Sequence, residues 1–139
     1  MQELIPLREF DEAVEFALRE VYLAELIAAT PKKTRITSTQ WKIKRIDMFK
    51  YEIRNDYTTG DGKYTIVELL EFGTRPHDIR PVRRKALHWQ KGSKDFFATR
   101  VHHPGFEARR FIQRTLDNPE LAVRFEKFVW HYLKQRLKF

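Results

Sequence analysis

Cysteine is absent from this 139-residue chain. A disulfide framework and a zinc site built on thiolates are therefore both excluded. The chain also has no apolar run near the roughly 20 residues that a membrane-spanning helix needs, and we expect no membrane partner. The first residues, MQELIPLREFDE, are acidic and amphipathic, which is not the pattern of a signal peptide.

Apolar residues are plentiful enough to build a core. Hydrophobic residues make up 42% of the chain and aromatic residues 14%, so the composition excludes a disordered tail. The length fits a single domain spanning residues 1–139 and leaves little room for a second. We found no repeat, low-complexity tract or interdomain linker.

Charge is unevenly distributed along the chain. The net charge is +8, but residues 1–30 hold seven acidic and two basic side chains, whereas residues 75–110 hold ten basic and three acidic ones. An acidic helix and a basic region on one small protein can meet opposite patches on a neighbour, or the basic region can meet phosphate. Composition alone does not separate these alternatives.

Residues 7–29 show the spacing of a long helix that ends before Thr30-Pro31, because the residue before proline avoids the helical region. The apolar stripe consists of Leu7, Phe10, Val14, Ala17, Val21, Ala24 and Ala28. This heptad-like spacing is compatible with a coiled coil. The small residues on the stripe favour a helix lying on a sheet.

Alternating patterns predict several strands. Residues 41–46 and 49–54 read as a hairpin with a turn at Asp47-Met48. Residues 64–72, rich in β-branched and aromatic side chains, are the best candidate for a central strand, which Gly73-Thr74 stops. Two prolines make residues 75–84 irregular.

The second half of the chain predicts another hairpin and two helices. The hairpin strands are residues 86–90 and 96–101, joined by Lys91-Gly92-Ser93-Lys94. The helices are residues 106–116 and about 119–137, the second with a capping side chain and proline at its start. The predicted fold is α+β: an N-terminal helix, a largely antiparallel sheet of about five strands with a protruding loop-hairpin, and two C-terminal helices.

An ordered set of short motifs over residues 64–116 resembles a known family. The set comprises Leu70-Glu71-Phe72-Gly73-Thr74, His77, Ile79, Pro81, Lys85-Ala86-Leu87, Trp89, Phe97, Val101, His103-Pro104-Gly105, Ala108 and Phe111-Ile112. It is similar to the tail-completion or neck proteins of long-tailed phages, the group typified by gene product ten of phage HK ninety-seven. Two positions depart from the pattern: Arg110 stands where a proline is usual, and Lys33-Thr34-Arg35 replaces an acid-Thr-Gly triplet.

The resemblance implies a non-catalytic structural protein of a virion or prophage, assembled in the host cytoplasm. It would be a subunit of a ring, hexameric by this resemblance, at the head–tail junction or tail end, beside other neck or tail proteins and close to DNA. We expect the subunit contacts to come from the basic loop and hairpin. The expected contact residues are Arg75, His77, Arg83, Arg84, Trp89 and Phe96.

Glycine and histidine in this region have structural interpretations. Gly73 permits a backbone conformation that is barred to residues with a Cβ, and Pro104-Gly105 marks a second turn. Two adjacent histidines on an extended chain point to opposite faces, and no helical histidine pair exists. We therefore predict no metal site and no cofactor, and expect His77 and His103 to bond the backbone.

Two alternatives remain. Basic residues between Arg75 and Lys94, with Trp89, Phe96 and Phe97 beside them, are compatible with nucleic-acid binding. A small toxin-type ribonuclease is the other alternative, with His77 or His103 working with Glu68, Glu71 or Asp78. No cysteine or serine nucleophile motif is present, and we predict that the protein is not an enzyme.

Overall fold

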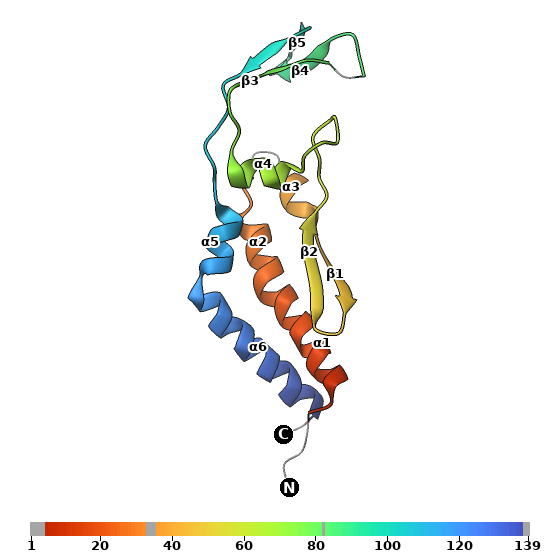
Figure 1. The fold of residues 1–139 in the computed structure, drawn as a ribbon, viewed down its shortest axis with the longest axis vertical. Helices are drawn as coiled ribbons and strands as arrows, with labels where there is room; N and C mark the ends of the chain where they lie inside the picture. The colour runs from red at the N-terminus through yellow and green to blue at the C-terminus, as the bar shows by residue number, and fades with distance from the viewer. Residues whose placement is uncertain (1–4, 33–35, 82, 138–139) are drawn as a thin grey trace. The chain divides into compact units, whose positions relative to one another are not determined.

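The computed structural model describes residues 5–32, 36–81 and 83–137. They form two compact units. Unit 1 contains the described residues up to Tyr57 and from Arg110 onward, and unit 2 contains those between Thr58 and Arg109. Each unit is drawn in Figure 1. The architecture is α+β, as predicted. The assignment of residues 1–139 to one neck-type domain stays a prediction.

The described residues contain six strands, all in antiparallel pairs. They are β1 (Trp41–Asp47), β2 (Lys50–Asn55), β3 (His77–Ile79), β4 (Leu87–Lys91), β5 (Lys94–Ala98) and β6 (Val101–His103). The pairs are β1–β2, β3–β6 and β4–β5, and each is a separate two-stranded sheet. The prediction of antiparallel pairing is confirmed, but these strands do not join into one sheet.

One physical reason for the separate sheets is that the predicted central strand is a helix. Residues Ile66–Phe72 form α4, and the prediction of a strand over 64–72 is wrong. Thr65 caps the helix by accepting a hydrogen bond from the Glu68 N–H at 3.3 Å. Threonine followed three residues later by glutamate is the sequence pattern of a helix start, and here it outweighs the strand propensity of the apolar side chains.

The first helical run in unit 1 spans the predicted residues 7–29. It consists of α1 (Leu7–Ala17), a π-helical segment η1 (Leu18–Leu23) and α2 (Ala24–Ala29). It ends at Thr30, whose ψ of 127° is extended, as expected before a proline. The connector after it holds a short helix, α3 (Ile36–Thr39); Lys33-Thr34-Arg35 lies outside the described residues.

The π-helical segment changes which face of the helix is buried. From Ala13 onward the buried positions are Ala13, Ala17, Val21, Leu26 and Thr30. Their spacing is four residues except across η1, where it is five. A π-helical turn contains one residue more than the usual hydrogen-bonded turn, so the apolar stripe moves by one position. The predicted stripe is therefore wrong at Ala24 and Ala28, which are exposed. It is also wrong at its first member, Leu7, which is 63% exposed.

The core of unit 1 joins α1 to the last helix, α6 (Pro119–Leu137). Ala13 and Ala17 pack with Val129 and Leu133, and Figure 1 shows α1 lying between α6 and the β1–β2 hairpin. The helix thus has a helix on one side and a small sheet on the other. The predicted bounds of α6 are confirmed, and Asn118 caps it by accepting the Glu120 N–H at 3.0 Å.

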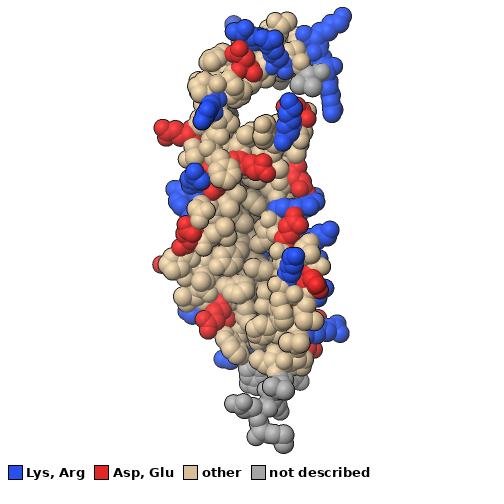
Figure 2. Space-filling view, in the orientation of Figure 1, with Lys and Arg blue, Asp and Glu red and all other residues tan. Residues whose placement is uncertain are grey.

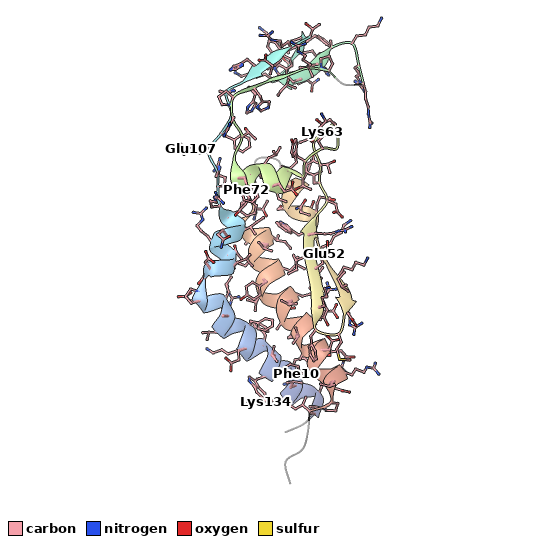
Figure 3. The ribbon with its side chains drawn as sticks, viewed as in Figure 1. Phe10, Glu52, Lys63, Phe72, Glu107 and Lys134 are labelled. Atoms are coloured by element: carbon pink, nitrogen blue, oxygen red, sulfur yellow. The ribbon has the colours of Figure 1, made fainter. Side chains whose placement is uncertain are left out.

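The β1–β2 hairpin is held to α1 by one buried carboxylate. Asp11 accepts hydrogen bonds from the Tyr51 hydroxyl at 2.6 Å and the Phe49 N–H at 2.8 Å. Its other oxygen pairs with Arg45 Nε at 2.9 Å. Phe10, labelled in Figure 3, adds an edge contact to the Phe49 ring, with centroids 5.4 Å apart. The turn lies at Met48-Phe49, one residue later than predicted.

The helix before α6 is shorter than predicted. α5 covers Phe111–Asp117 rather than 106–116, because Arg110 adopts a left-handed conformation with φ of 52°. A proline could not take that φ. Arginine at this position therefore permits a chain path into the helix that proline would not.

Candidate functional site

The candidate site is the exposed part of unit 2 that we call the arm, defined as the described residues 75–81 and 83–103. At its base Thr74 and Phe106 form an isolated backbone bridge, with N–H donating to O in both directions at 3.0 and 3.1 Å. Gly73 and Gly105 flank this bridge with φ of 74° and 77°. Both stand where the backbone requires a residue without a Cβ.

The strand pair β3–β6 begins the arm. The expectation that residues 75–84 are wholly irregular is wrong for His77–Ile79, which pair with Val101–His103. The two prolines, Pro76 and Pro81, lie outside the paired stretch. They therefore do not remove any hydrogen-bond donor from His77–Ile79. The pairing places His77 opposite His103, and Asp78 opposite His102.

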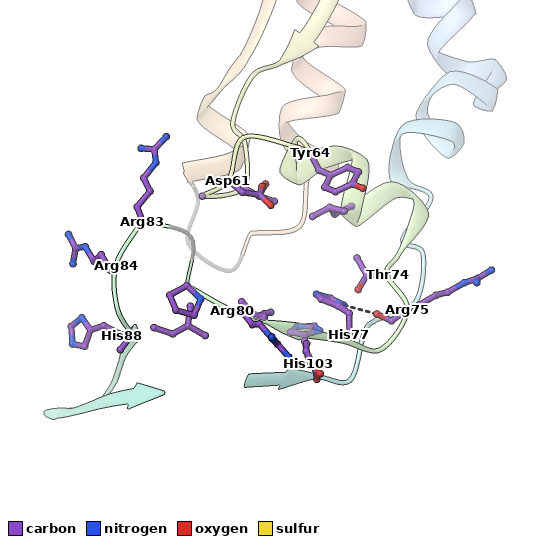
Figure 4. Close-up of a pocket in the computed structure, with 18 of the residues that line it drawn as sticks. Asp61, Tyr64, Thr74, Arg75, His77, Arg80, Arg83, Arg84, His88 and His103 are labelled. Atoms are coloured by element: carbon purple, nitrogen blue, oxygen red, sulfur yellow. Dashed lines mark hydrogen bonds between the residues drawn. The ribbon is translucent and has the colours of Figure 1, made fainter. Parts of the chain in front are cut away.

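His77 and His103 stack on one face of this pair, with ring centroids 5.1 Å apart. His77 Nδ1 donates to Arg75 O at 2.7 Å, and His103 Nδ1 accepts the Gly105 N–H at 3.0 Å. Figure 4 shows the two rings together and the first of these bonds. Both are backbone contacts of the predicted kind, and they tie the ring positions to the base of the arm.

A second cluster lies on the other face of β3–β6. Asp78 accepts from His102 Nδ1 at 3.0 Å and pairs with Arg100 Nε at 3.3 Å. The hydrogen bond from His102, aided by the charge of Arg100, holds the pKa of Asp78 below its usual value. This cluster was not predicted from the sequence, although the alternation of β3 and β6 places these side chains together once the pairing is known.

The structure brings together the two histidines that the ribonuclease alternative needs, but it does not place any of the proposed acids beside them. His77 and His103 come together, whereas Asp78 bonds His102 on the opposite face. Glu71 is buried, and Glu68 is exposed on α4. Within the described part of the chain, no group of three or more His, Cys, Asp or Glu side chains is placed to hold a metal ion.

An open cavity of about 930 Å³ lies within unit 2, between the loop at Asp61 and Tyr64 and the first part of the arm. Figure 4 shows His77 and His103 beside it, while the charged ends of Arg75, Arg83 and Arg84 point away from the histidine pair. The cavity therefore does not gather its arginines around one ligand position. Its rim is instead a positively charged outer surface.

The β4–β5 hairpin forms the rest of the arm. The predicted hairpin is confirmed, with β5 at 94–98 rather than 96–101. Gly92, at φ of 66°, occupies the first position of the two-residue turn, as in a type II′ turn. Among the described residues from Arg83 to Phe97, all but Ala86 and Leu87 are exposed.

The two faces of the hairpin differ. One carries the cross-strand pairs Trp89–Phe96 and Lys91–Lys94. The other carries His88, Gln90, Asp95 and Phe97, where Asp95 accepts from His88 at 2.9 Å and from Gln90 at 2.8 Å. These two hydrogen bonds, the His88 bond first, lower the pKa of Asp95.

The six expected contact residues divide between these places. Arg75 and His77 lie at the start of the arm, Arg83 and Arg84 on the cavity rim, and Trp89 and Phe96 on one hairpin face. All six are exposed. The N-terminal helix carries the opposite charge to the arm, but three of its acids are less available for a contact with another molecule. Asp11, Glu12 and Glu15 pair with Arg45, Arg8 and Arg19, respectively.

Comparisons with known proteins do not identify the candidate site. No family model, no curated protein and no solved structure matches this chain. Among the described residues, no helix has both the length and the apolar character needed to cross a membrane.

Proposed function

We propose that this protein is a non-catalytic structural subunit of a phage or prophage virion. It forms or joins a ring at the head–tail junction or tail end. The resemblance of residues 64–116 to the neck and tail-completion proteins supports the proposal. The structural observation that carries it is the exposure of nearly every described residue between Arg83 and Phe97, because an arm with so little cover of its own fits a contact with another molecule.

In this proposal the arm works by geometry. Head-to-tail contacts between identical subunits close into a ring when the rotation between neighbours closes. Arg75 and His77 at the start of the arm, with Arg83 and Arg84 on the cavity rim, meet the next copy or an adjoining virion protein. The glycine-flanked bridge at Thr74 and Phe106 sets the direction in which the arm leaves the rest of unit 2. Charge orients the contact more than it strengthens it.

Electron microscopy of the full chain at high concentration, and of virions labelled with an antibody to it, tests the proposal. Annular particles or label at the neck or tail end are expected. The variant Arg75→Glu/Arg84→Glu should lose them. The control Lys127→Glu/Lys134→Glu makes the same charge change at exposed positions of α6 and should keep them.

The proposal fails if neither rings nor virion label are found, or if both charge-reversal variants assemble equally well. The neighbouring reading frames provide an independent check, since portal, capsid and tail-tube genes beside this one are expected.

A further inference from the structure

The Trp89–Phe96 face of the β4–β5 hairpin is a flat, open aromatic surface. The two rings stack across the strands with centroids 5.6 Å apart and planes 15° from parallel. Trp89 is 42% exposed and Phe96 39%. Such a pair stabilises the hairpin from one side and leaves ring area free for a further planar group.

Two lysines extend the same face toward the turn. Lys91 and Lys94 stand directly opposite each other, an arrangement of like charges that normally destabilises a strand pair. Both are exposed, and neither forms an ion pair with any residue that the structure describes. The only acid of the hairpin, Asp95, is on the other face and bonded there to His88 and Gln90.

The surroundings add further positive charge. The sequence from Ile79 to Lys94 contains six arginines and lysines and no acid. Figure 2 shows Lys and Arg side chains gathered over the hairpin and the segment before it. The aromatic pair is thus set in a field that attracts a polyanion.

We propose that this face binds single-stranded nucleic acid. Trp89 and Phe96 stack on bases, and Lys91 and Lys94 neutralise the adjoining phosphates. Aromatic platforms beside cationic side chains bind single strands in this way, with little dependence on sequence. A duplex offers its phosphates but keeps its base faces stacked internally, so it would use only the lysines.

The acidic helix of a second copy fits this face less well. Three of its six acids, Asp11, Glu12 and Glu15, already have cationic partners within unit 1, and carboxylates make no use of two stacked rings. The inference goes beyond the proposed function and does not depend on it. It assigns Trp89 and Phe96 to nucleic acid in place of the expected subunit contact.

Fluorescence anisotropy of the full chain with a labelled oligothymidylate of about 20 nucleotides tests the inference, at low and moderate salt. The wild type should bind the single strand more tightly than the matched duplex. Trp89→Ala/Phe96→Ala should weaken single-strand binding by at least about fivefold, the lower end of the loss for one stacked base. Lys91→Gln/Lys94→Gln should reduce the slope of log affinity against log salt by roughly 1.4.

The matched control is Gln90→Ala/Phe97→Ala, which alters the opposite face of the same hairpin and should bind as the wild type does. Circular dichroism verifies that each variant is folded. Unlabelled polyglutamate is the competitor that has charge without bases, and it should displace the oligonucleotide poorly.

The inference is overturned if the wild type does not bind the single strand or binds the duplex equally well. It is also overturned if both faces matter equally, or if polyglutamate competes as well as oligothymidylate, which would indicate an acidic protein partner. Scoring the same variants for rings keeps the two proposals apart. Rings that persist while nucleic-acid binding is absent would leave the proposed function standing.

Discussion

Gly73 and Gly105 lie on either side of the Thr74–Phe106 bridge, and each contacts the backbone segment that contains the other end of the bridge. A Cβ on Gly73 would lie 2.7 Å from the Phe106 carbonyl oxygen, and a Cβ on Gly105 would overlap the carbonyl oxygen of Thr74. Each glycine therefore lets the opposite backbone approach closely. The pair joins the end of α4 to the return of the arm.

Gly105→Ala should destabilise the base of the arm. The positive φ and the overlap with Thr74 together are expected to cost roughly 1–3 kcal/mol or more. Denaturant unfolding measures the loss, and faster amide exchange at Thr74 and Phe106 locates it. Gly60→Ala is the matched control, since nothing lies within 4 Å of a Cβ there. An equal effect of the two substitutions would contradict the close approach described at Gly105.

Asp11→Asn should lower the melting temperature by several degrees, because an amide cannot accept all the hydrogen bonds that Tyr51, Phe49 and Arg45 make to the carboxylate. Those bonds, the Tyr51 bond first, hold the pKa of Asp11 below 3.8. Their contribution is complete above the unfolded-state pKa and is lost as pH falls through the lower folded-state value.

Acid titration of stability measures this contribution. The Asp11→Asn variant should lose less stability than the wild type when the pH falls below 3.8, while Asp61, Asp78 and Asp95 preserve part of the slope because their pKa values are also lowered. Asp56→Asn, which changes an exposed carboxylate, is the control. Parallel acid curves for the wild type and Asp11→Asn would refute the role given to this carboxylate.

Tyr51 should make the fold sensitive to alkali. Burial and the hydrogen bond to Asp11 raise the pKa of its hydroxyl from 10.0 to about 12. A group with a raised folded-state pKa contributes stability that is complete below the unfolded value and lost as pH rises to the folded value. Wild-type stability should therefore fall between pH 10 and about 12 by more than that of Tyr51→Phe.

Phenolate absorbance checks the same assignment without unfolding. The wild type should show a late ionisation step near pH 12 that belongs to Tyr51, and Tyr51→Phe should remove that step. A wild-type titration curve with no late step would contradict the assignment.

Leu133→Ala should cost about 2–5 kcal/mol, since the side chain is fully buried between α6 and α1 and its loss leaves a cavity. Val123→Ala, on the same helix but 54% exposed, should change the free energy of unfolding by no more than about 0.5 kcal/mol. Chemical denaturation measures both. Similar losses for the two variants would place the core of unit 1 elsewhere.

Local patterns predicted the elements that local interactions decide. The alternation of Ile43 with its neighbours, the capping residue before Pro119 and the proline after Thr30 each act within a few residues. The prediction for residues 64–72 was wrong because their side chains favour strands. The Thr65–Glu68 capping pattern in the same stretch indicates a helix start instead. A capping pattern deserves more weight than propensity over a stretch this short.

Long-range contacts were beyond reach for a different reason. Asp11 looked like one of many surface acids, and only its approach to Arg45 and Tyr51, more than 30 residues away, makes it a buried anchor. The Trp89–Phe96 and Lys91–Lys94 pairs were within reach, because a two-residue turn at Gly92-Ser93 dictates which residues stand opposite. These two pairs were not predicted because the second strand of the hairpin was placed at 96–101 rather than at 94–98.

The π-helical turn at Leu18–Leu23 also governs how β1 is attached. Beyond it, Thr30 is buried and its hydroxyl accepts a hydrogen bond from the Trp41 indole at 2.7 Å. Deleting one residue from that turn would restore the regular four-residue spacing and keep Thr30 on the buried face, whereas deleting one residue from α2 would rotate Thr30 by about 100° and move it away from the tryptophan. When homologous chains are aligned, a single-residue gap within this turn should therefore be compatible with keeping both the threonine and the indole, whereas a gap within α2 should coincide with the loss of one of them.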